Sequence, residues 1–541
     1  MAVRLPAAFV ERMQHLLGDE FDSFMKSYDS APHAGIRVNT LKASVKEFQR
    51  LTPFELTAIP WCPSGFYVPY GTKPGLHPYY HAGIYYIQEP SAMAPAELLG
   101  VKPGDRVLDL CAAPGGKSTQ IAAKLEGQGV LVTNDISADR TKALAKNIEL
   151  YGVRNAVVLN ETPQKIADAF PNYFDKILID APCSGEGMFR KDEDMIKQWE
   201  THSVERCVLM QRDILQTAAS LLAPGGTIVY STCTFAPEEN ESMIGEFLQA
   251  HPDFRVIPVG PELGFRPGRP DWLQGMAGTD DLSDQVKEQL TGTGRLWPHV
   301  IEGEGHYAAV LQQVIDPDTA ADVNASLLTS ESAFEESVSI MDSSLAVQTE
   351  PGNRERKSSR RSERLKREPG GRTADHGHRH KSKEGGRRGQ PPAADPLEVY
   401  RQFVSVELRL TLPGETVMYG DRIYQCPVDP RRLDGLKVVR PGWFTGNIKN
   451  GRFVPSHPLA AALHPEEAVR TVNLLSGNGE AVRYLKGETL AVTADSVQCK
   501  GNVSPKGYVL VCIDGYAAGW GKWLDGMLRN EYPAGWRWTS V

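Results

Sequence analysis

The stretch that decides the fold is residues 107–118, VLDLCAAPGGKS. Its first four residues are mostly apolar, which is typical of a strand buried in a parallel sheet. A turn of small residues follows at 111–116, and the apolar face of 117–125 predicts a helix. Glycines in such a turn let a ligand approach the backbone, and the helix start offers N–H groups without partners. We therefore predict a nucleotide-type binding site, although an ordinary tight turn in an α/β domain has the same pattern.

Strands and helices alternate beyond this stretch. The sequence predicts strands at 107–110, 130–133, 156–159, 176–179 and 227–230, and helices at 117–125, 138–150, 163–170 and 201–222. This alternation predicts a doubly wound parallel sheet, in which ligands bind beyond the carboxyl ends of the strands. The candidate side chains that follow predicted strands are Cys111, Asp135, Glu161, Asp180 and Cys233.

Asp135 has the position expected of a ribose-binding residue. An acidic side chain after the second strand commonly accepts hydrogen bonds from ribose hydroxyls. The turn lacks the GxGxxG pattern of dinucleotide-binding proteins, and APGGKS lacks the spacing of a GxxxxGK[ST] phosphate loop. We therefore expect an adenosyl ligand rather than a dinucleotide or ATP.

Two thiols follow predicted strands, Cys183 in DAPCSG (180–185) and Cys233 in STCT (231–234). A free cysteine is most often a small buried hydrophobe, so either thiol alone carries little weight. Two thiols at adjacent strand ends beside a cofactor site are instead candidates for a carbon nucleophile, because a few per cent of a thiol is ionised at neutral pH.

These motifs together resemble one family. DLCAAPGGKS (109–118), NDIS (134–137), DAPCSG and STCTFAPEENE (231–241), in this order, are similar to the Nop/Sun family of RNA cytosine-5 methyltransferases. The N-terminal LPxxFxxRMxxLLG, RVNTLK (37–42), YIQEPSAM (86–93), RLWPH (295–299) and GEGHYAAVL (303–311) resemble its bacterial RsmF-type branch, which modifies small-subunit ribosomal RNA. The resemblance implies a Rossmann-like class I S-adenosylmethionine-dependent methyltransferase core that acts on RNA, with 16S rRNA or the small subunit as substrate.

The resemblance also implies roles for individual residues. Cys233 would add to carbon 6 of cytosine, Cys183 would assist loss of the carbon-5 proton, and Asp180 would bind the cytosine edge and border the cofactor. Asp135, supported by Arg140, would hold the ribose of S-adenosylmethionine, and Glu161 with Thr162 would lie near its adenine. The methionine part would lie along Cys111, Ala112, Ala113, Pro114, Gly115, Gly116 and Lys117.

Composition restricts the partners and the cellular location that can be expected for the protein. The net charge of −8, taken by itself, gives no reason to expect a nucleic-acid partner. The eight cysteines have no paired spacing that would suggest disulfides or structural zinc. No apolar run is long enough to span a membrane, so we expect a cytoplasmic protein. We further expect a monomer that binds neither DNA nor membrane and holds no metal.

The rest of the chain flanks the catalytic region. The sequence predicts a small N-terminal α+β RNA-binding domain (1–75), the methyltransferase domain (76–315), a disordered charged linker (316–394), an intermediate RNA-binding module (395–460) and a PUA-like RNA-binding module (461–541). Arg37 and Lys42 are candidates for phosphate contacts, although solvated surface is the commoner place for such residues. Four C-terminal tryptophans could stack bases, but we expect at least two to form a small core: Trp520, Trp523, Trp536 and Trp538.

Within the linker, residues 353–389 contain 14 Lys+Arg against five Asp+Glu. This stretch can bind RNA phosphates or simply solubilise the chain, and the sequence leaves both open.

Two further functions compete with RNA cytosine methylation. One is a ribosome assembly factor without turnover, which both thiols and Asp180 argue against. The other is methylation of DNA or of a protein glutamine, which DAPCSG in place of an NPPY motif argues against.

Overall fold

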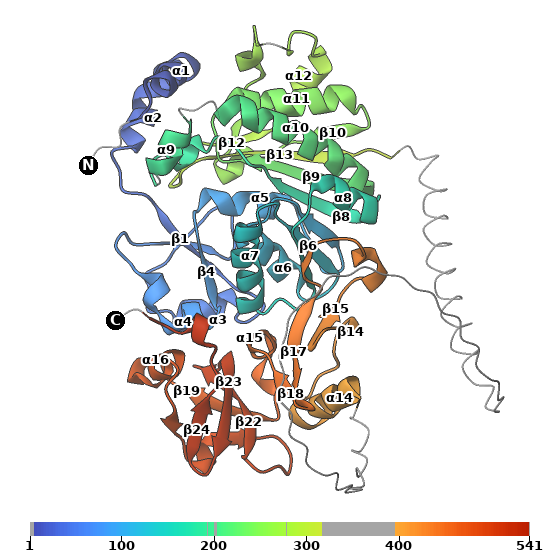
Figure 1. Cartoon of the computed structure of the whole chain (residues 1–541). Coiled ribbons are helices and arrows are strands. Elements are labelled where there is room, and N and C mark those ends of the chain that lie inside the picture. The colour runs from blue at the N-terminus through green and yellow to red at the C-terminus, as the bar shows by residue number, and fades with distance from the viewer. Residues whose placement is uncertain (1–4, 192, 200–202, 277, 316–394, 540–541) are drawn as a thin grey trace, which may run out of the picture. The chain divides into compact units, whose positions relative to one another are not determined.

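The computed structural model describes residues 5–191, 193–199, 203–276, 278–315 and 395–539 (Figure 1). The predicted linker at 316–394 lies outside the described residues. Three parts follow one another along the chain: an N-terminal sheet, a large central sheet with helices on both faces, and two C-terminal sheets.

The central sheet has ten strands, and its middle is parallel. Strands β9, β8, β5, β6 and β7 run parallel in that spatial order. Their bounds are β5 Arg106–Asp109, β6 Val130–Asn134, β7 Ala156–Leu159, β8 Phe174–Asp180 and β9 Leu222–Thr232. The five predicted parallel strands are therefore confirmed, and so is the Rossmann-like α/β class.

Side chains alternate between the two faces of this sheet, which divides the core into two layers. Val130 and Val132 of β6 pack in one cluster with α8 Pro163–Ala169, α10 Ser203–Leu221 and α11 Glu241–Ala250. Leu131, between them, packs in the other cluster with α5 Ala94–Leu98, α6 Gly116–Leu125 and α7 Ala138–Leu150. Figure 1 shows α5, α6 and α7 grouped on one side of the sheet. Because helices cover both faces of the sheet, its strands contain short runs of apolar residues, which is the pattern from which the buried strands were predicted.

Both edges of the sheet are antiparallel, which the sequence did not predict. Beside β9 lies β13 His306–Gln313, followed by β12 Gly294–Leu296 and β11 Arg266–Pro267, while β10 Phe254–Ile257 also pairs with β13. At the other edge β16 Val438–Arg440, from the C-terminal part of the chain, pairs antiparallel with β7. The sheet is thus mixed rather than wholly parallel. The remaining helices here are α9 Glu193–Trp199 and α12 Asp284–Leu290.

The N-terminal part combines helices with a small antiparallel sheet, as expected. It contains α1 Ala7–Leu17, α2 Phe21–Ser27, α3 Val45–Leu51, α4 Pro78–His81 and the sheet β2 Thr57–Ala58, β3 Gly65–Val68, β1 Ala34–Val38 and β4 Tyr85–Gln88. Strand β4 lies beyond residue 75, so this sheet continues past the end of the first predicted segment.

Arg37 and Lys42 both have hydrogen-bond partners inside the protein. The structure therefore supports neither the predicted contact of these residues with RNA phosphates nor their alternative place on the solvated surface. The Arg37 guanidinium is buried, and it donates hydrogen bonds to Gln120 Oε1 (3.2 Å) and Thr119 Oγ1 (2.8 Å) of α6. Lys42 Nζ donates to the carbonyl oxygen of Ala82 at 2.6 Å. The expectation failed because charged side chains are normally exposed unless the fold supplies such partners.

Two sheets make up the C-terminal part. The first is β14 Glu415–Tyr419, β15 Arg422–Cys426, β17 Trp443–Lys449 and β18 Arg452–Pro455, with α14 Pro396–Glu407 and α15 His457–Ala462. The second is β20 Leu490–Ala491, β24 Met527–Asn530, β23 Tyr516–Leu524, β22 Gly507–Ile513, β19 Arg470–Leu474 and β21 Val497–Cys499, with α16 Glu480–Leu485. Trp520 and Trp523 are buried, which confirms that at least two of the four tryptophans serve the core.

Candidate functional site

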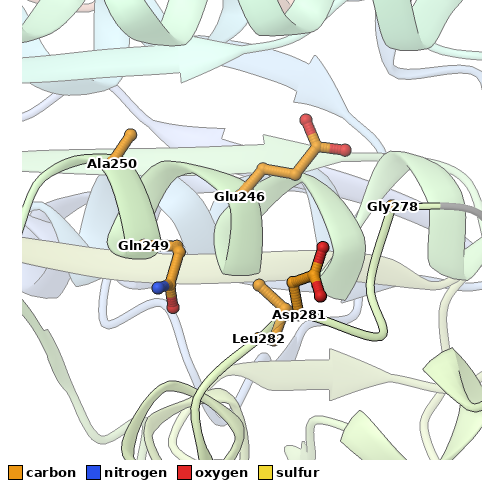
Figure 2. Close-up of a pocket in the computed structure, with 6 residues that line it drawn as sticks. All are labelled: Glu246, Gln249, Ala250, Gly278, Asp281 and Leu282. Atoms are coloured by element: carbon orange, nitrogen blue, oxygen red, sulfur yellow. The ribbon is translucent and has the colours of Figure 1, made fainter.

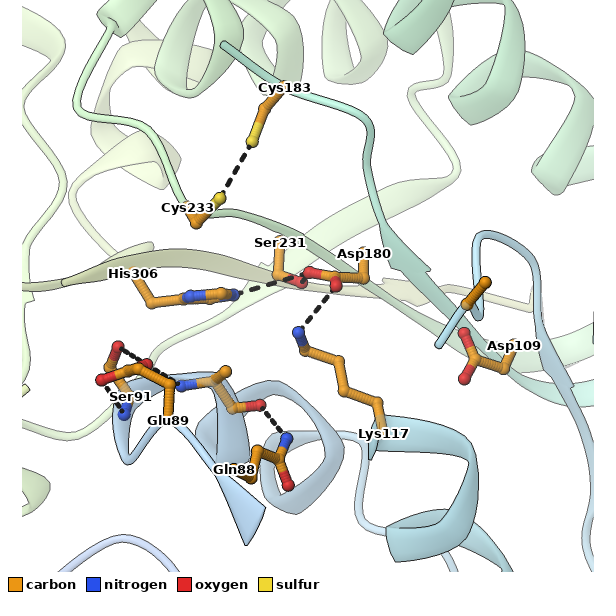
Figure 3. Close-up of polar contacts among 12 residues, drawn as sticks. Gln88, Glu89, Ser91, Asp109, Lys117, Asp180, Cys183, Ser231, Cys233 and His306 are labelled. Atoms are coloured by element: carbon orange, nitrogen blue, oxygen red, sulfur yellow. Dashed lines mark hydrogen bonds and ion pairs between the residues drawn. The ribbon is translucent and has the colours of Figure 1, made fainter. Parts of the chain in front are cut away.

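The two predicted thiols meet at the carboxyl edge of the central sheet (Figure 3). Cys183 follows β8 and Cys233 follows β9, and because these strands are parallel neighbours their ends lie side by side. The two Sγ atoms are 3.3 Å apart, and both residues are only half-buried. The hydrogen bond with Cys233 and burial raise the pKa of the Cys183 thiol. A thiol with a raised pKa is a strong base once it is deprotonated.

Asp180 ends β8 beside the thiols and is held by three neighbours. Its carboxylate pairs with Lys117 Nζ at 2.7 Å and accepts a hydrogen bond from Ser231 Oγ at 3.1 Å, and His306 Nε2 lies 3.6 Å away. Burial alone would raise the pKa of Asp180, but the charge of Lys117 and the nearby His306 hold it well below its usual value. Asp180 therefore stays an anionic acceptor at neutral pH.

Ser231 and His306 enlarge the predicted site, which already included Lys117. The sequence placed Lys117 along the cofactor, whereas in the structure its ammonium group reaches Asp180. Ser231 and His306 were not predicted as site residues. A polar side chain in the STCT motif and a histidine at the start of the apolar run 306–311 were the available signals.

The glycine turn and Asp135 form a second group of contacts. Asp135 is 3% exposed, and its carboxylate accepts from the backbone N–H of Ala113 (3.3 Å) and Ser137 (2.8 Å). Arg140 lies 3.5 Å from the same carboxylate and donates to the carbonyl of Ala113 at 2.5 Å. Gly115 has φ +110°, a conformation that favours glycine. The turn thus packs directly against the predicted ribose-binding residue.

Asp109, which the sequence analysis did not select, has a buried carboxylate oxygen that fits a polar ligand. Its Oδ2 accepts from Ser118 Oγ at 2.6 Å, while Oδ1 is buried without a hydrogen-bond partner among the described residues. Burial raises the pKa of Asp109 to about 7. An unsatisfied buried oxygen is costly, and an ammonium or hydroxyl group of a ligand would satisfy it. The amino and ribose hydroxyl groups of S-adenosylmethionine have that chemistry.

Glu161 and Thr162 lie after β7, where the adenine contact was predicted. Glu161 is 2% exposed, and its carboxylate accepts from the backbone N–H of Thr162 (3.3 Å) and of Lys437 (2.9 Å). Burial acts to raise the pKa of Glu161, but these donors and Lys165 lower it below the usual value. Thr162 is exposed and precedes α8.

Two buried carboxylates that the sequence analysis did not select connect the thiol-bearing loops. Glu239 accepts from the backbone N–H of Ser184 at 3.0 Å and from Gln211 Nε2 at 2.8 Å. Glu186 accepts from the backbone N–H of Phe235 at 3.1 Å and pairs with Arg12 of α1. Each carboxylate thus joins the loop of Cys183 to a segment beyond it, and neither motif spacing nor periodicity reveals such contacts.

Other features of the described residues lie apart from this cluster. A cavity of about 260 Å³ is lined by Glu246, Gln249, Ala250, Gly278, Asp281 and Leu282, none of which is a predicted site residue (Figure 2). Within the described ranges, no group of three or more His, Cys, Asp or Glu side chains is placed to hold a metal ion. No helix in the part of the chain that the structure describes is long and apolar enough to cross a membrane.

A parallel sheet with a glycine turn after β5 and an acidic residue after β6 defines the class. It is the Rossmann-like fold of S-adenosylmethionine-dependent methyltransferases. Four family models match successive parts of the chain: the N-terminal domain of 16S rRNA methyltransferase RsmF (5–90), 16S rRNA methyltransferase RsmB/F (96–312), the RsmF rRNA methyltransferase first C-terminal domain (402–463) and the methyltransferase RsmF PUA domain (476–538). The chain belongs to the RsmB/F methyltransferase family, which is S-adenosylmethionine-dependent.

Individual relatives agree with this assignment. The chain is 38% identical over 325 residues to ribosomal RNA small subunit methyltransferase F of Erwinia tasmaniensis and 36% identical over 326 residues to its namesake from Escherichia coli. Each match covers 58% of this chain and 64% of the relative. The crystal structure of PH0851 superposes with a TM-score of 0.51 at 29% identity, covering 57% of this chain and 66% of the other. The family resemblance read from the motifs is confirmed.

Proposed function

We propose that this protein transfers a methyl group from S-adenosylmethionine to carbon 5 of cytosine in RNA, with 16S ribosomal RNA as the substrate. The observation that carries the proposal is the pair of thiols, 3.3 Å apart, beside the anionic Asp180. Carbon 5 of cytosine is a poor nucleophile, so the reaction needs an activating group, and a thiolate is a suitable one. The curated relatives named above, which carry the name ribosomal RNA small subunit methyltransferase F, support the choice of RNA.

S-adenosylmethionine supplies an electrophilic methyl on a sulfonium centre. The Cys233 thiolate adds to carbon 6, and the ring electrons then make carbon 5 nucleophilic. Asp180 accepts a hydrogen bond from the exocyclic N4 amine, as acidic side chains do with cytosine. Carbon 5 bonds to the methyl group as the sulfur–methyl bond breaks, and S-adenosylhomocysteine leaves. Cys183, acting as a thiolate, then takes the proton from carbon 5, the carbon 5–carbon 6 double bond re-forms, and Cys233 leaves as a thiolate.

The flanking parts are proposed to select RNA rather than DNA. The match to a PUA domain at 476–538 and to two further RsmF domains supports N-terminal and C-terminal RNA-binding segments around a catalytic one. We propose that the protein works as a cytoplasmic monomer and that the basic stretch 353–389 adds a sequence-independent grip on phosphates.

The test is methyl transfer from labelled S-adenosylmethionine to ribosomal RNA lacking the modification, with the product mapped by bisulfite sequencing. We expect label at cytosine only. Label on protein or DNA, or none on any substrate, would contradict the proposal, and the last result would favour an assembly factor without turnover.

Cysteine variants test the covalent route. Cys233→Ala should abolish methylation and form no adduct. Cys183→Ala should still attack and transfer but release RNA slowly, so that an adduct survives denaturing electrophoresis. Cys499→Ala is the matched control, because this half-buried thiol lies on β21 of a C-terminal sheet and should change neither result. An adduct in Cys233→Ala alone would exchange the two roles, and activity retained in both variants would exclude covalent catalysis.

A further inference from the structure

A strand from the C-terminal part of the chain completes the sheet beside the predicted adenine contact. Strand β16 pairs antiparallel with β7, with Val438 opposite Leu159. Directly before β16, the carbonyl oxygen of Lys437 accepts from the backbone N–H of Asn160 at 3.0 Å. The backbone N–H of Lys437 donates to Glu161 Oε1 at 2.9 Å. One C-terminal residue therefore contacts both residues that follow β7.

The same contacts continue to the predicted ribose site. Asn160, fixed by Lys437 through its backbone, donates from its side chain to the carbonyl oxygen of Asp135 at 2.7 Å. Glu161 depends on Lys437 more directly, since a carboxylate that is 2% exposed needs donors to replace water. If β16 left the sheet, Glu161 would lose one of its backbone donors and the edge of β7 would be open.

A salt bridge anchors the strand. Arg440 Nε pairs with Glu149 Oε1 of α7 at 2.5 Å, and both side chains are largely shielded from solvent. The anchor lies on α7 and β16, apart from Glu161 itself. Docking of the strand can therefore be weakened without altering the carboxylate.

We infer that β16 belongs to the cofactor site: the Lys437 backbone positions Glu161 and Asn160, so that the adenosyl part of S-adenosylmethionine binds fully only when β16 is docked. Lys437 is a positioning residue, and the inference rests on the proposed role of Glu161. Because coupling between two equilibria is reciprocal, cofactor binding should also strengthen docking of β16. The affinity of the catalytic domain for its cofactor would then depend on whether the C-terminal segment is docked.

The first test uses the full chain with two substitutions at one position. Lys437→Pro removes the N–H donor, whereas Lys437→Ala keeps it and removes only the side chain. We expect Lys437→Pro to weaken binding of S-adenosylhomocysteine, measured by calorimetry, by about tenfold, the low end for loss of a hydrogen bond to a charged group. Lys437→Ala should bind like the unaltered protein. Equal weakening in both variants would show that the side chain acts rather than the backbone, and would overturn the inference.

A second variant covers the case in which proline disturbs folding. Arg440→Ala should weaken docking and reduce affinity for S-adenosylhomocysteine, while Arg431→Ala, which removes an exposed pair with Asp429 in the same module, should not. Hydrogen exchange of 437–440 should slow when S-adenosylhomocysteine is added to the unaltered protein. Unchanged exchange together with normal binding by Arg440→Ala would overturn the inference.

Glu161→Ala separates this inference from the proposed function. Weak binding by Glu161→Ala with normal binding by Lys437→Pro would keep Glu161 in the cofactor site and reject the role of β16. Normal binding by both would remove Glu161 from the site and reject the inference. Methylation of cytosine at saturating S-adenosylmethionine would still test the proposed function by itself.

Discussion

Removing Arg12 should destabilise the protein and disturb both thiol-bearing loops. The carboxylate of Glu186, three residues after Cys183, is completely buried and accepts from the N–H of Phe235, two residues after Cys233. Its positive partner is Arg12, whose side chain is 23% exposed. Arg12→Leu would leave a buried charge without its counter-ion, which typically costs about 3–5 kcal/mol, and the partial exposure of Arg12 favours the lower end.

A double-mutant cycle measures this interaction. Urea unfolding should give Arg12→Leu a loss of about 3 kcal/mol, whereas adding Glu186→Gln should restore part of it, because the amide carries no charge and its oxygen can still accept from Phe235. Arg212→Leu is the control, since its pair with Glu246 is partly exposed and should contribute no more than about 1 kcal/mol. Adduct formation at saturating substrate should also slow in Arg12→Leu. A loss equal to that of the control, with unchanged adduct formation, would refute the reasoning.

Three further changes test Asp135, Glu239 and the basic stretch 353–389. Asp135→Ala should weaken S-adenosylmethionine binding by roughly 1.5–3 kcal/mol in calorimetry, since a charged hydrogen-bond acceptor is lost, and unchanged affinity would remove Asp135 from the site. Burial raises the pKa of Glu239 to about 7, so its contribution to stability is present below pH 4.5 and disappears as the pH rises through 7; urea midpoints of Glu239→Gln should lack this dependence. Deleting 353–389 should reduce the salt dependence of RNA binding and leave S-adenosylmethionine affinity unchanged, because the stretch is basic and contains no site residue.

Sequence periodicity predicted the parallel strands because each is covered on both faces and therefore reads as a short apolar run. The bounds of β7 and α7 match the predicted ranges, and the other parallel strands differ by a few residues at their ends. Strand β16 could not be found in this way. It has three residues, and its partner strand lies far away in the sequence, so nothing local marks it as part of the central sheet.

The rule that ligands bind beyond strand ends placed the thiols and Asp180 in one region, and the structure brings them together. The same rule says nothing about where a long side chain points. Lys117 lies in the turn-to-helix segment assigned to the cofactor, yet its ammonium group ends at Asp180. The prediction that Arg37 contacts phosphate or solvent failed for a related reason. The fold supplies buried acceptors for it on α6, and no local sequence pattern indicates them.

The two antiparallel edges explain how residues outside the parallel core reach the site. An antiparallel strand begins at the edge where its parallel neighbours end, so its first residues must lie beside their carboxyl ends. Strand β13 begins at His306 beside the end of β9, and His306 lies 3.6 Å from Asp180. Strand β16 is preceded by Lys437, which contacts Glu161 beyond the end of β7. Both edges therefore deliver a residue to the carboxyl side of the sheet, one beside the thiols and one beside the predicted adenine contact. The rule that places ligands beyond parallel strands thus also predicts, in a mixed sheet, that the first residues of the antiparallel neighbours belong to the site.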